Sequence, residues 1–150
     1  MNSKVILLVE DEPDEQTLTL RALRRNNITN EVIVAQDGAE ALDYLFGTGM
    51  YAERDPLELP AVVILDLNLP RLHGLDVLRC IRDDHRTRLL PVVILSSSKA
   101  EDDLIASYRL GANSYIRKPV AFDAFIDVMR QFGLYWLSVN EVPPRSASRR

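Results

Sequence analysis

The sequence contains one cysteine, no long apolar run and no excess of basic residues, and each of these absences excludes a class of protein. With Cys80 as its only cysteine the chain cannot form an internal disulfide, and a helical pattern around it indicates a core residue rather than a reactive thiol. No apolar stretch reaches the length of a membrane span, and the N-terminus lacks the pattern of a cleavable signal. The formal net charge of −4 disfavours nucleic acid or an anionic membrane as a partner. We therefore expect a cytoplasmic protein.

What is present is the composition of an ordinary globular domain. Of the 150 residues, 47% are hydrophobic and 27% are charged, which allows one domain with a substantial core. We expect this domain to span residues 1–142, and we expect residues 143–150, which are rich in proline, serine and arginine, to form a disordered tail. Too few residues follow the last predicted helix for a DNA-binding effector domain.

Five short segments with strand character alternate with helical patterns. The predicted strands are residues 4–9, 31–36, 61–66, 92–95 and 114–117. The first helix is predicted from Pro13, with Asp14 and Glu15 suited to its dipole, and the last helix from about residue 120 to about residue 139. Alternating strands and helices predict an α/β fold in which a parallel sheet lies between two layers of helices.

Two connecting segments carry local signals. Ser98 followed by Glu101 fits the capping box S-x-x-E, which predicts that the fourth helix begins at Ser98. Residues 47–59 form a long connection interrupted by Gly47, Gly49 and Pro56, and connections of this length are often functional. The sequence assigns this connection no role.

Polar residues follow four of the predicted strands at the point where each strand ends. Glu10 and Asp11 follow the first strand, Asp66 the third, Ser96 the fourth and Lys118 the fifth. Each has an ordinary explanation on its own, as a helix-dipole, turn or surface residue. Because the carboxyl ends of parallel strands meet at one edge, where ligands bind in such sheets, their coincidence indicates a shared site.

The residue types at this edge suit phosphoryl transfer. Neighbouring carboxylates repel one another, and a hard cation such as Mg²⁺, which prefers oxygen ligands, would keep them ionised. An ionised Asp66 could then attack phosphorus and form an acyl phosphate. Lys118 would balance the charge of the phosphoryl oxygens, and the Ser96 hydroxyl could donate a hydrogen bond to one of them.

Four segments of the chain occur in an order that resembles the receiver domain of two-component response regulators. They lie between about residues 4 and 132 and are Val9-Glu10-Asp11-Glu12, Asp66-Leu67-Asn68-Leu69-Pro70 with Gly74, Ser96-Ser97, and Tyr115-Ile116-Arg117-Lys118-Pro119. The resemblance implies a three-layer, doubly wound, flavodoxin-like fold whose five-stranded parallel sheet has the strand order 2-1-3-4-5. It also implies a single-domain response regulator that accepts a phosphoryl group from a sensor histidine kinase.

The resemblance assigns a role to each matching residue of the site. It makes Asp66 the phosphoacceptor. It makes Asp11 and Asp66 ligands of Mg²⁺, together with the backbone carbonyl of Asn68, while Glu10 acts through water.

The same resemblance assigns the residues that respond to phosphorylation. Lys118 is expected to pair with the phosphate, and Ser96 and Tyr115 to form a switch pair. The signal is expected to leave through a changed surface of the fourth helix, fifth strand and fifth helix.

A narrower resemblance is to the stand-alone regulators of bacterial phytochrome-type histidine kinases. It rests on Tyr44-Leu45-Phe46 before the long connection and on the aromatic residues of the last helix. Aromatic residues beyond the domain edge suggest a partner surface, and we expect an isologous homodimer. The predicted interface residues are Phe122, Phe125, Phe132, Tyr135 and Trp136.

Other functions fit the sequence less well. A receiver-shaped interaction module that is not phosphorylated is the main alternative, but the acidic pair, Asp66 and Lys118 are all present. A phosphatase with an Asp nucleophile usually needs a second acid nearby, which Leu67 and Asn68 do not supply, so turnover of an external substrate is not expected. A nucleotide-binding module would need a G-x-G-x-x-G or P-loop pattern, which the chain lacks.

Overall fold

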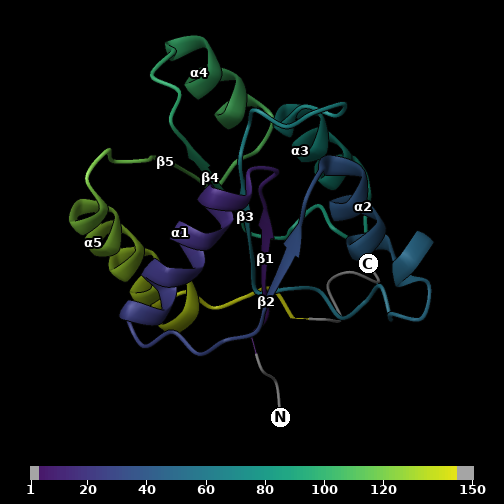
Figure 1. Ribbon diagram of the computed structural model, residues 1–150. Coiled ribbons are helices and arrows are strands. Elements are labelled where there is room, and N and C mark those ends of the chain that lie inside the picture. The colour runs from purple at the N-terminus through teal and green to yellow at the C-terminus, as the bar shows by residue number, and fades with distance from the viewer. Residues whose placement is uncertain (1–3, 145–150) are drawn as a thin grey trace.

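A five-stranded parallel sheet forms the centre of the computed structural model, which describes residues 4–144 (Figure 1). The strands are β1 Ile6–Val9, β2 Val32–Ala35, β3 Val62–Leu65, β4 Val92–Ser96 and β5 Ser114–Arg117. They lie in the order β2-β1-β3-β4-β5, and every neighbouring pair is parallel. The predicted α/β fold and its strand order are confirmed.

Helices cover both faces of this sheet. They are α1 Pro13–Arg25, α2 Gly38–Phe46, α3 Gly74–Asp83, α4 Glu101–Arg109 and α5 Phe122–Gly133, with a 3-10 turn η1 Gly49–Tyr51 and a π-helical segment η2 Leu134–Val139. Helices α1 and α5 lie side by side over one face, whereas α2 and α3 cover the other (Figure 1). The predicted three-layer arrangement follows from these two helix layers.

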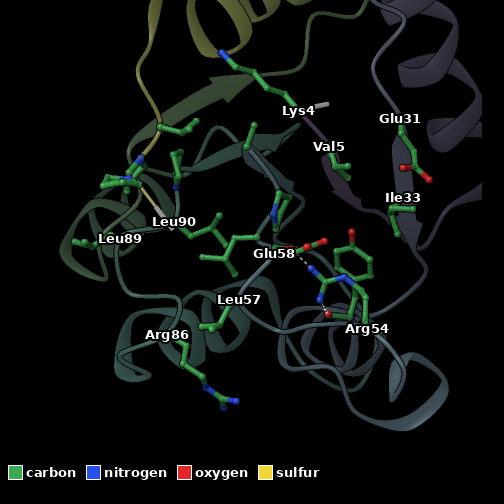
Figure 2. A pocket seen from close by; sticks show the side chains of 18 of the residues that line it. Lys4, Val5, Glu31, Ile33, Arg54, Leu57, Glu58, Arg86, Leu89 and Leu90 are labelled. Atoms are coloured by element: carbon green, nitrogen blue, oxygen red, sulfur yellow. Dashed lines mark hydrogen bonds between the residues drawn. The ribbon is translucent and has the colours of Figure 1, made fainter. Parts of the chain in front are cut away.

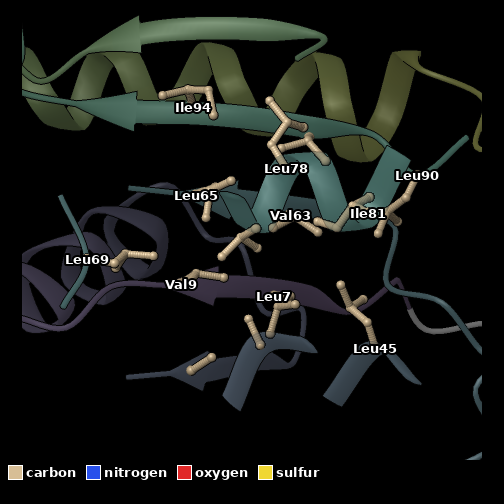
Figure 3. Close-up of a cluster of buried hydrophobic side chains, with 14 of the residues drawn as sticks. Leu7, Val9, Leu45, Val63, Leu65, Leu69, Leu78, Ile81, Leu90 and Ile94 are labelled. Carbon is tan, nitrogen blue, oxygen red and sulfur yellow. The ribbon is translucent and has the colours of Figure 1, made fainter. Parts of the chain in front are cut away.

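The side chains of the central strands alternate between two hydrophobic cores. Leu7 and Val9 of β1 point toward α2 and α3, where they pack in a cluster with residues of β3 and β4 (Figure 3). Ile6 and Leu8 point to the opposite face, toward α1 and α5. Because both faces are covered, β1 and β3 are buried throughout, which explains their uninterrupted apolar sequences.

Helix α4 begins later than the capping-box pattern predicts. Its first residue is Glu101 and its N-cap is Ala100, so the predicted start at Ser98 is wrong. The Ser98 hydroxyl instead accepts a hydrogen bond from the Ala100 N–H (3.2 Å) and donates one to Asp103 Oδ2 (2.6 Å). The chain between β4 and α4 stays non-helical, and Ser98 stabilises this turn rather than capping the helix.

The last helix continues to Val139, as predicted, but its aromatic residues divide between core and surface. Phe125 and Phe132 are only 5% and 3% exposed and pack in the core beneath α5, so their assignment to a dimer surface is corrected. Phe122 and Trp136 are half-buried against the same core, whereas Tyr135 is 49% exposed.

The long connection at residues 47–59 is held by specific contacts. The rings of Tyr44 and Tyr51 meet edge to face at 5.1 Å, and the Arg54 guanidinium lies 4.0 Å from the centre of the Tyr44 ring. Arg54 also donates hydrogen bonds to the backbone carbonyls of Tyr44 and Glu58 (Figure 2). The connection borders a cavity of about 730 Å³ at the edge where the strands begin, opposite Asp66.

The two ends of the described chain lie together at this same edge. Lys4 Nζ donates a hydrogen bond to the Leu137 carbonyl (2.9 Å), and Lys4 lines the cavity together with Pro143 and Pro144. The rest of the predicted tail, residues 145–150, lies outside the described residues. Within residues 4–144, no helix has the length and apolar character needed to cross a bilayer.

Candidate functional site

Strand register brings three carboxylates together at the carboxyl edge of the sheet. Val9 and Leu65 are partners across β1 and β3, so the residues that follow them, Glu10 and Asp66, emerge side by side. The Asp66 N–H donates to the Val9 carbonyl (3.1 Å), which continues this pairing one residue beyond β3. Glu10, Asp11 and Asp66 each offer a carboxylate oxygen within 4.8 Å of the others. The predicted convergence of these three residues is therefore present.

Lys118 provides the positive charge beside this cluster. Its Nζ lies 2.8 Å from Glu10 Oε1 and 3.4 Å from Glu15 Oε2. Its backbone N–H donates to the Ser96 carbonyl (2.9 Å), which fixes the start of the chain beyond β5. Burial alone would lower the pKa of Lys118, because it disfavours the charged ammonium. The hydrogen bond to Glu10 and the negative charges of Glu10, Asp66 and Glu15 have a larger effect in the opposite direction, so the pKa of Lys118 is raised.

Glu10 is the most buried acid of the group, with 3% of its surface exposed. Burial raises the pKa of Glu10, and the nearby charge of Asp66 adds to this, while the bond from Lys118 opposes it. The carboxylates therefore repel one another in a partly desolvated site, where a hard cation is the natural partner. An all-oxygen donor set of this kind fits Mg²⁺ or Mn²⁺.

The loop after Asp66 folds tightly onto the start of α3. Leu67 is fully buried, and its carbonyl accepts a hydrogen bond from the Gly74 N–H (2.8 Å). A Cβ on Gly74 would lie 2.3 Å from the Asp66 carbonyl oxygen and 2.6 Å from the Leu67 Cα. Only glycine permits this approach, so Gly74 sets the position of the Asp66 backbone.

The predicted switch residues both contact residue 98. The buried Ser96 Oγ accepts a hydrogen bond from the Ser98 N–H (3.1 Å). The Tyr115 hydroxyl donates to the Ser98 carbonyl at 3.3 Å. Ser96 and Tyr115 are thus linked through one loop residue.

A comparison with known protein families identifies the family of this chain. Residues 6–130 match the family described as the response regulator receiver domain. The chain belongs to this family. The resemblance inferred from the sequence is confirmed.

Among relatives of this receiver domain are regulators of phytochrome systems. The response regulator Rcp1 of Synechocystis sp. is 36% identical over 140 residues, which cover 93% of each chain. The crystal structure of the phosphorylated cyanobacterial phytochrome response regulator RcpA has a TM-score of 0.87 and 36% identity, covering 95% of this chain and 100% of that one. The bacteriophytochrome response regulator AtBRR is 48% identical with a TM-score of 0.75, covering 94% of this chain and 100% of its own. A structure of Rcp1 in its Mn²⁺-bound form has a TM-score of 0.85, with 35% identity over 94% of this chain and 99% of that one.

The receiver site contains two residues that sequence reasoning missed. Glu15 is a second acceptor for Lys118, although an acid in the first turn of a helix is ordinarily explained by the helix dipole. Ser98 joins the switch pair, but its sequence pattern indicated a helix cap. Asn68 lies exposed two residues after Asp66, and the role of its carbonyl as a metal ligand stays a prediction.

Proposed function

We propose that this receiver domain accepts a phosphoryl group on Asp66 from a sensor histidine kinase, in a reaction that depends on Mg²⁺. The observation that carries the proposal is the cluster of Glu10, Asp11 and Asp66, whose carboxylate oxygens lie within 4.8 Å of one another, with the Lys118 ammonium 2.8 Å from Glu10. A nucleophile, a set of oxygen ligands and a counter-charge therefore occupy one edge of the sheet.

The transfer is a substitution at phosphorus. An oxygen of the Asp66 carboxylate attacks the phosphorus of a phosphohistidine, the P–N bond breaks, and the imidazole leaves and takes up a proton, giving an aspartyl phosphate. Asp11, Asp66 and the Asn68 carbonyl would hold Mg²⁺, with Glu10 acting through water, and the bound ion would supply positive charge that offsets the repulsion between the carboxylates and the phosphoryl oxygens. The relative Rcp1 has a Mn²⁺-bound form, which supports the proposal of a divalent cation in this domain.

Lys118 and Ser96 respond to the new phosphoryl group. Lys118 exchanges its contact with Glu10 for one with a phosphoryl oxygen, because the aspartyl phosphate carries more negative charge than the carboxylate. The Ser96 oxygen accepts the Ser98 N–H, so its own proton is free to be donated to a phosphoryl oxygen. Through Tyr115, this event alters the surface of α4, β5 and α5, with a coupling of about 1–3 kcal/mol. The domain acts as a phosphoacceptor and turns over no external substrate.

The first prediction tests phosphoryl acceptance directly. Incubation with a small phosphodonor and Mg²⁺ should label the protein, and chelation or Asp66→Asn should abolish the label, because the amide is not a nucleophile for phosphorus. Asp83→Asn, which makes the same chemical change at an exposed position at the end of α3, is the matched control and should label normally. Labelling of Asp66→Asn at the wild-type rate would overturn the proposal. Absence of labelling in the wild type would favour the unphosphorylated interaction module.

We assign the phosphodonor kinase to the bacterial phytochrome type. The support comes from relatives, because RcpA is a phytochrome response regulator and AtBRR a bacteriophytochrome response regulator. In the same labelling experiment, an autophosphorylated phytochrome-type kinase should transfer phosphate faster than a histidine kinase with a different sensor. Equal transfer from both kinases would remove this assignment.

We also propose a homodimer formed through the end of the last helix. After the correction of Phe125 and Phe132, the predicted interface keeps Phe122, Tyr135 and Trp136. The rings of Tyr135 and Trp136 meet edge to face at 4.9 Å, so the half-buried Trp136 supports an exposed Tyr135. Leu134 and Val139 are 54% and 67% exposed on the same segment, which adds apolar surface for a second copy of the chain to cover.

A further inference from the structure

The Lys118 ammonium lies between two carboxylates that differ in their surroundings. Its Nζ is 2.8 Å from Glu10 Oε1 and 3.4 Å from Glu15 Oε2, in the first turn of α1. Glu10 is buried, and its second oxygen, Oε2, accepts the Glu12 N–H (3.2 Å), whereas the Glu15 side chain is 41% exposed. Of these two acids, only Glu10 belongs to the group of carboxylates that includes Asp66. Glu15 therefore attracts the lysine from outside the acidic cluster.

The start of α1 fixes Glu15 in this place. Pro13 opens the helix, and the Gln16 side-chain amide donates to the Glu10 carbonyl (2.6 Å), which ties the first turn of α1 to the end of β1. The Lys118 side chain is only 12% exposed, so its ammonium relies on these carboxylates more than on water. The negative charge of Glu15 also contributes to the raised pKa of Lys118. The ammonium is thus stabilised in its resting position by Glu15 as well as by Glu10.

We propose that Glu15 is a positioning residue that holds the Lys118 ammonium in its resting position and competes for it with the phosphoryl group on Asp66. This inference rests on the proposed function, because the competition needs a phosphoryl group at Asp66. When Lys118 moves to a phosphoryl oxygen, its contact with Glu15 is lost. A contact that is present only before phosphorylation favours the unphosphorylated protein. Glu15 therefore lowers the affinity of the site for a phosphoryl group and slows the transfer to Asp66.

The experiment compares the wild type with Glu15→Gln and with a matched control, Asp14→Asn, at saturating Mg²⁺ and fixed pH. Glu15→Gln keeps the size of the side chain and removes its charge. Asp14 is the other acid in the first turn of α1 and is exposed. Asp14→Asn therefore removes an equal charge from the same helix end and leaves the contact between Glu15 and Lys118 in place.

Three quantities are measured for each protein. The first is the NMR signal of the Lys118 ammonium without any phosphodonor, which is assigned by its loss in Lys118→Arg. The assignment is simple because the chain has only three lysines, Lys4, Lys99 and Lys118. The second is the dissociation constant of beryllofluoride, an anion that mimics a phosphoryl group bound to a carboxylate. The third is the rate of labelling by a small phosphodonor.

Glu15→Gln should shift the Lys118 ammonium signal, because one of the two charged partners is gone. It should bind beryllofluoride about two- to fivefold more tightly, the effect of one partly exposed ion pair, and should accept phosphate faster by a similar factor. Asp14→Asn should resemble the wild type in all three measurements. A purely structural role of Glu15 would not produce this result, since damage to the site weakens anion binding and slows labelling.

Each contrary result has a distinct meaning. An unchanged Lys118 signal in Glu15→Gln overturns the positioning of the ammonium by Glu15. Beryllofluoride affinity equal to that of the wild type overturns the competition, and an equal gain in Asp14→Asn overturns a role specific to Glu15. If the wild type takes no label and binds no beryllofluoride, the proposed function fails and the competition fails with it. The Lys118 signal then still decides whether Glu15 positions the ammonium.

Discussion

Gly74 shows how closely the chain folds around the phosphoacceptor at the scale of one residue. A Cβ at this position would meet backbone atoms of Asp66 and Leu67, which cannot move without displacing the loop after β3. A Cβ at Gly38 would instead meet the side chains of Val77 and Leu72, at 2.6 and 3.0 Å. An added methyl group would therefore displace backbone atoms at Gly74 but side-chain atoms at Gly38.

This difference gives the second prediction. Gly74→Ala should lower the free energy of unfolding by about 2–3 kcal/mol and should also slow labelling of Asp66, because the strain falls on the backbone of the nucleophile. Gly38→Ala should cost about 1 kcal/mol, since side chains can shift, and should label normally. Denaturant unfolding and the labelling rate separate the two effects. A Gly74→Ala variant that unfolds and labels like the wild type would contradict the close packing of Gly74 against the backbone of Asp66 and Leu67.

Asp84 is the residue for which the structure gives the clearest dependence of folding stability on pH. Its carboxylate accepts hydrogen bonds from Arg86 Nε (3.0 Å) and Nη2 (2.8 Å), and the Arg86 guanidinium lowers the pKa of Asp84 to about 2. A lowered pKa means that the folded protein prefers the ionised acid. The stabilisation is therefore present above about pH 4, the ordinary pKa of Asp, and is lost as the pH falls toward 2.

The third prediction follows from this sign. Asp84→Asn should lower the free energy of unfolding at pH 7 by about 1 kcal/mol, a value reduced for solvent screening because the pair is partly exposed. The difference between wild type and variant should shrink between pH 4 and pH 2. Asp83→Asn is the control on the neighbouring exposed carboxylate. A difference that stays constant over this pH range would show that the ion pair is not its cause.

At the scale of secondary-structure elements, Arg82 joins the end of α3 to two other segments. Its Nε donates to the Gly111 carbonyl (2.9 Å) beyond α4. Its Nη1 donates to the Leu90 carbonyl (2.7 Å) before β4, and its Nη2 donates to Asn113 Oδ1 (2.9 Å) before β5. One guanidinium therefore holds α3 against the chain segments that precede both strands.

The fourth prediction concerns this contact between elements. Arg82→Lys should lower the free energy of unfolding by about 2 kcal/mol, because an ammonium cannot reach three separated acceptors with the geometry of a guanidinium. Arg79→Lys, an exposed position on the same helix, should change it by less than about 0.5 kcal/mol. Thermal or denaturant unfolding measures both. Equal stability of the two variants would mean that the hydrogen bonds of Arg82 contribute little.

Most helices and strands could be predicted from the sequence because their pattern of apolar and polar residues follows from which of their faces are buried. The fully covered strands β1 and β3 are continuous apolar runs, and they lie within the predicted segments. The start of α4 was missed because Ser98 and Glu101 satisfy a capping pattern while the serine bonds to Asp103. Phe125 and Phe132 show a different limit, since helical spacing identifies an apolar face but not whether that face meets the sheet or another molecule.

The candidate site was predictable for a related reason. Glu10, Asp66 and Lys118 each follow a strand directly, so parallel topology alone brings them to one edge. The contact between Lys118 and Glu15 was not predictable, because it depends on how a side chain of α1 is directed over the strand ends. The same holds for the link between Tyr115 and the Ser98 carbonyl.

At the scale of the whole molecule, exposed aromatic side chains lie on two different helical segments among the described residues. Tyr135 and its neighbours lie on η2, whereas Tyr108 is 51% exposed on α4.

This gives the fifth prediction. Tyr135→Ala should shift the protein toward monomer in sedimentation velocity by weakening association roughly tenfold or more, the usual effect of losing an aromatic anchor. Tyr108→Ala, an equal loss of aromatic surface, should leave association unchanged. The opposite pattern would place the dimer contact on α4.

The hydrogen bond between Lys4 and the Leu137 carbonyl has a practical consequence for handling the protein. Lys4, Pro143 and Pro144 line one cavity at the edge where the strands begin, so both ends of the described chain leave from the side opposite Asp66. Under the proposed phosphotransfer, a fusion partner or a surface joined next to Lys4 or Pro144 would start from the edge opposite the phosphoacceptor. The protein can be immobilised for phosphotransfer measurements without blocking its acidic edge, whereas a ligand screen against the cavity requires an untagged chain.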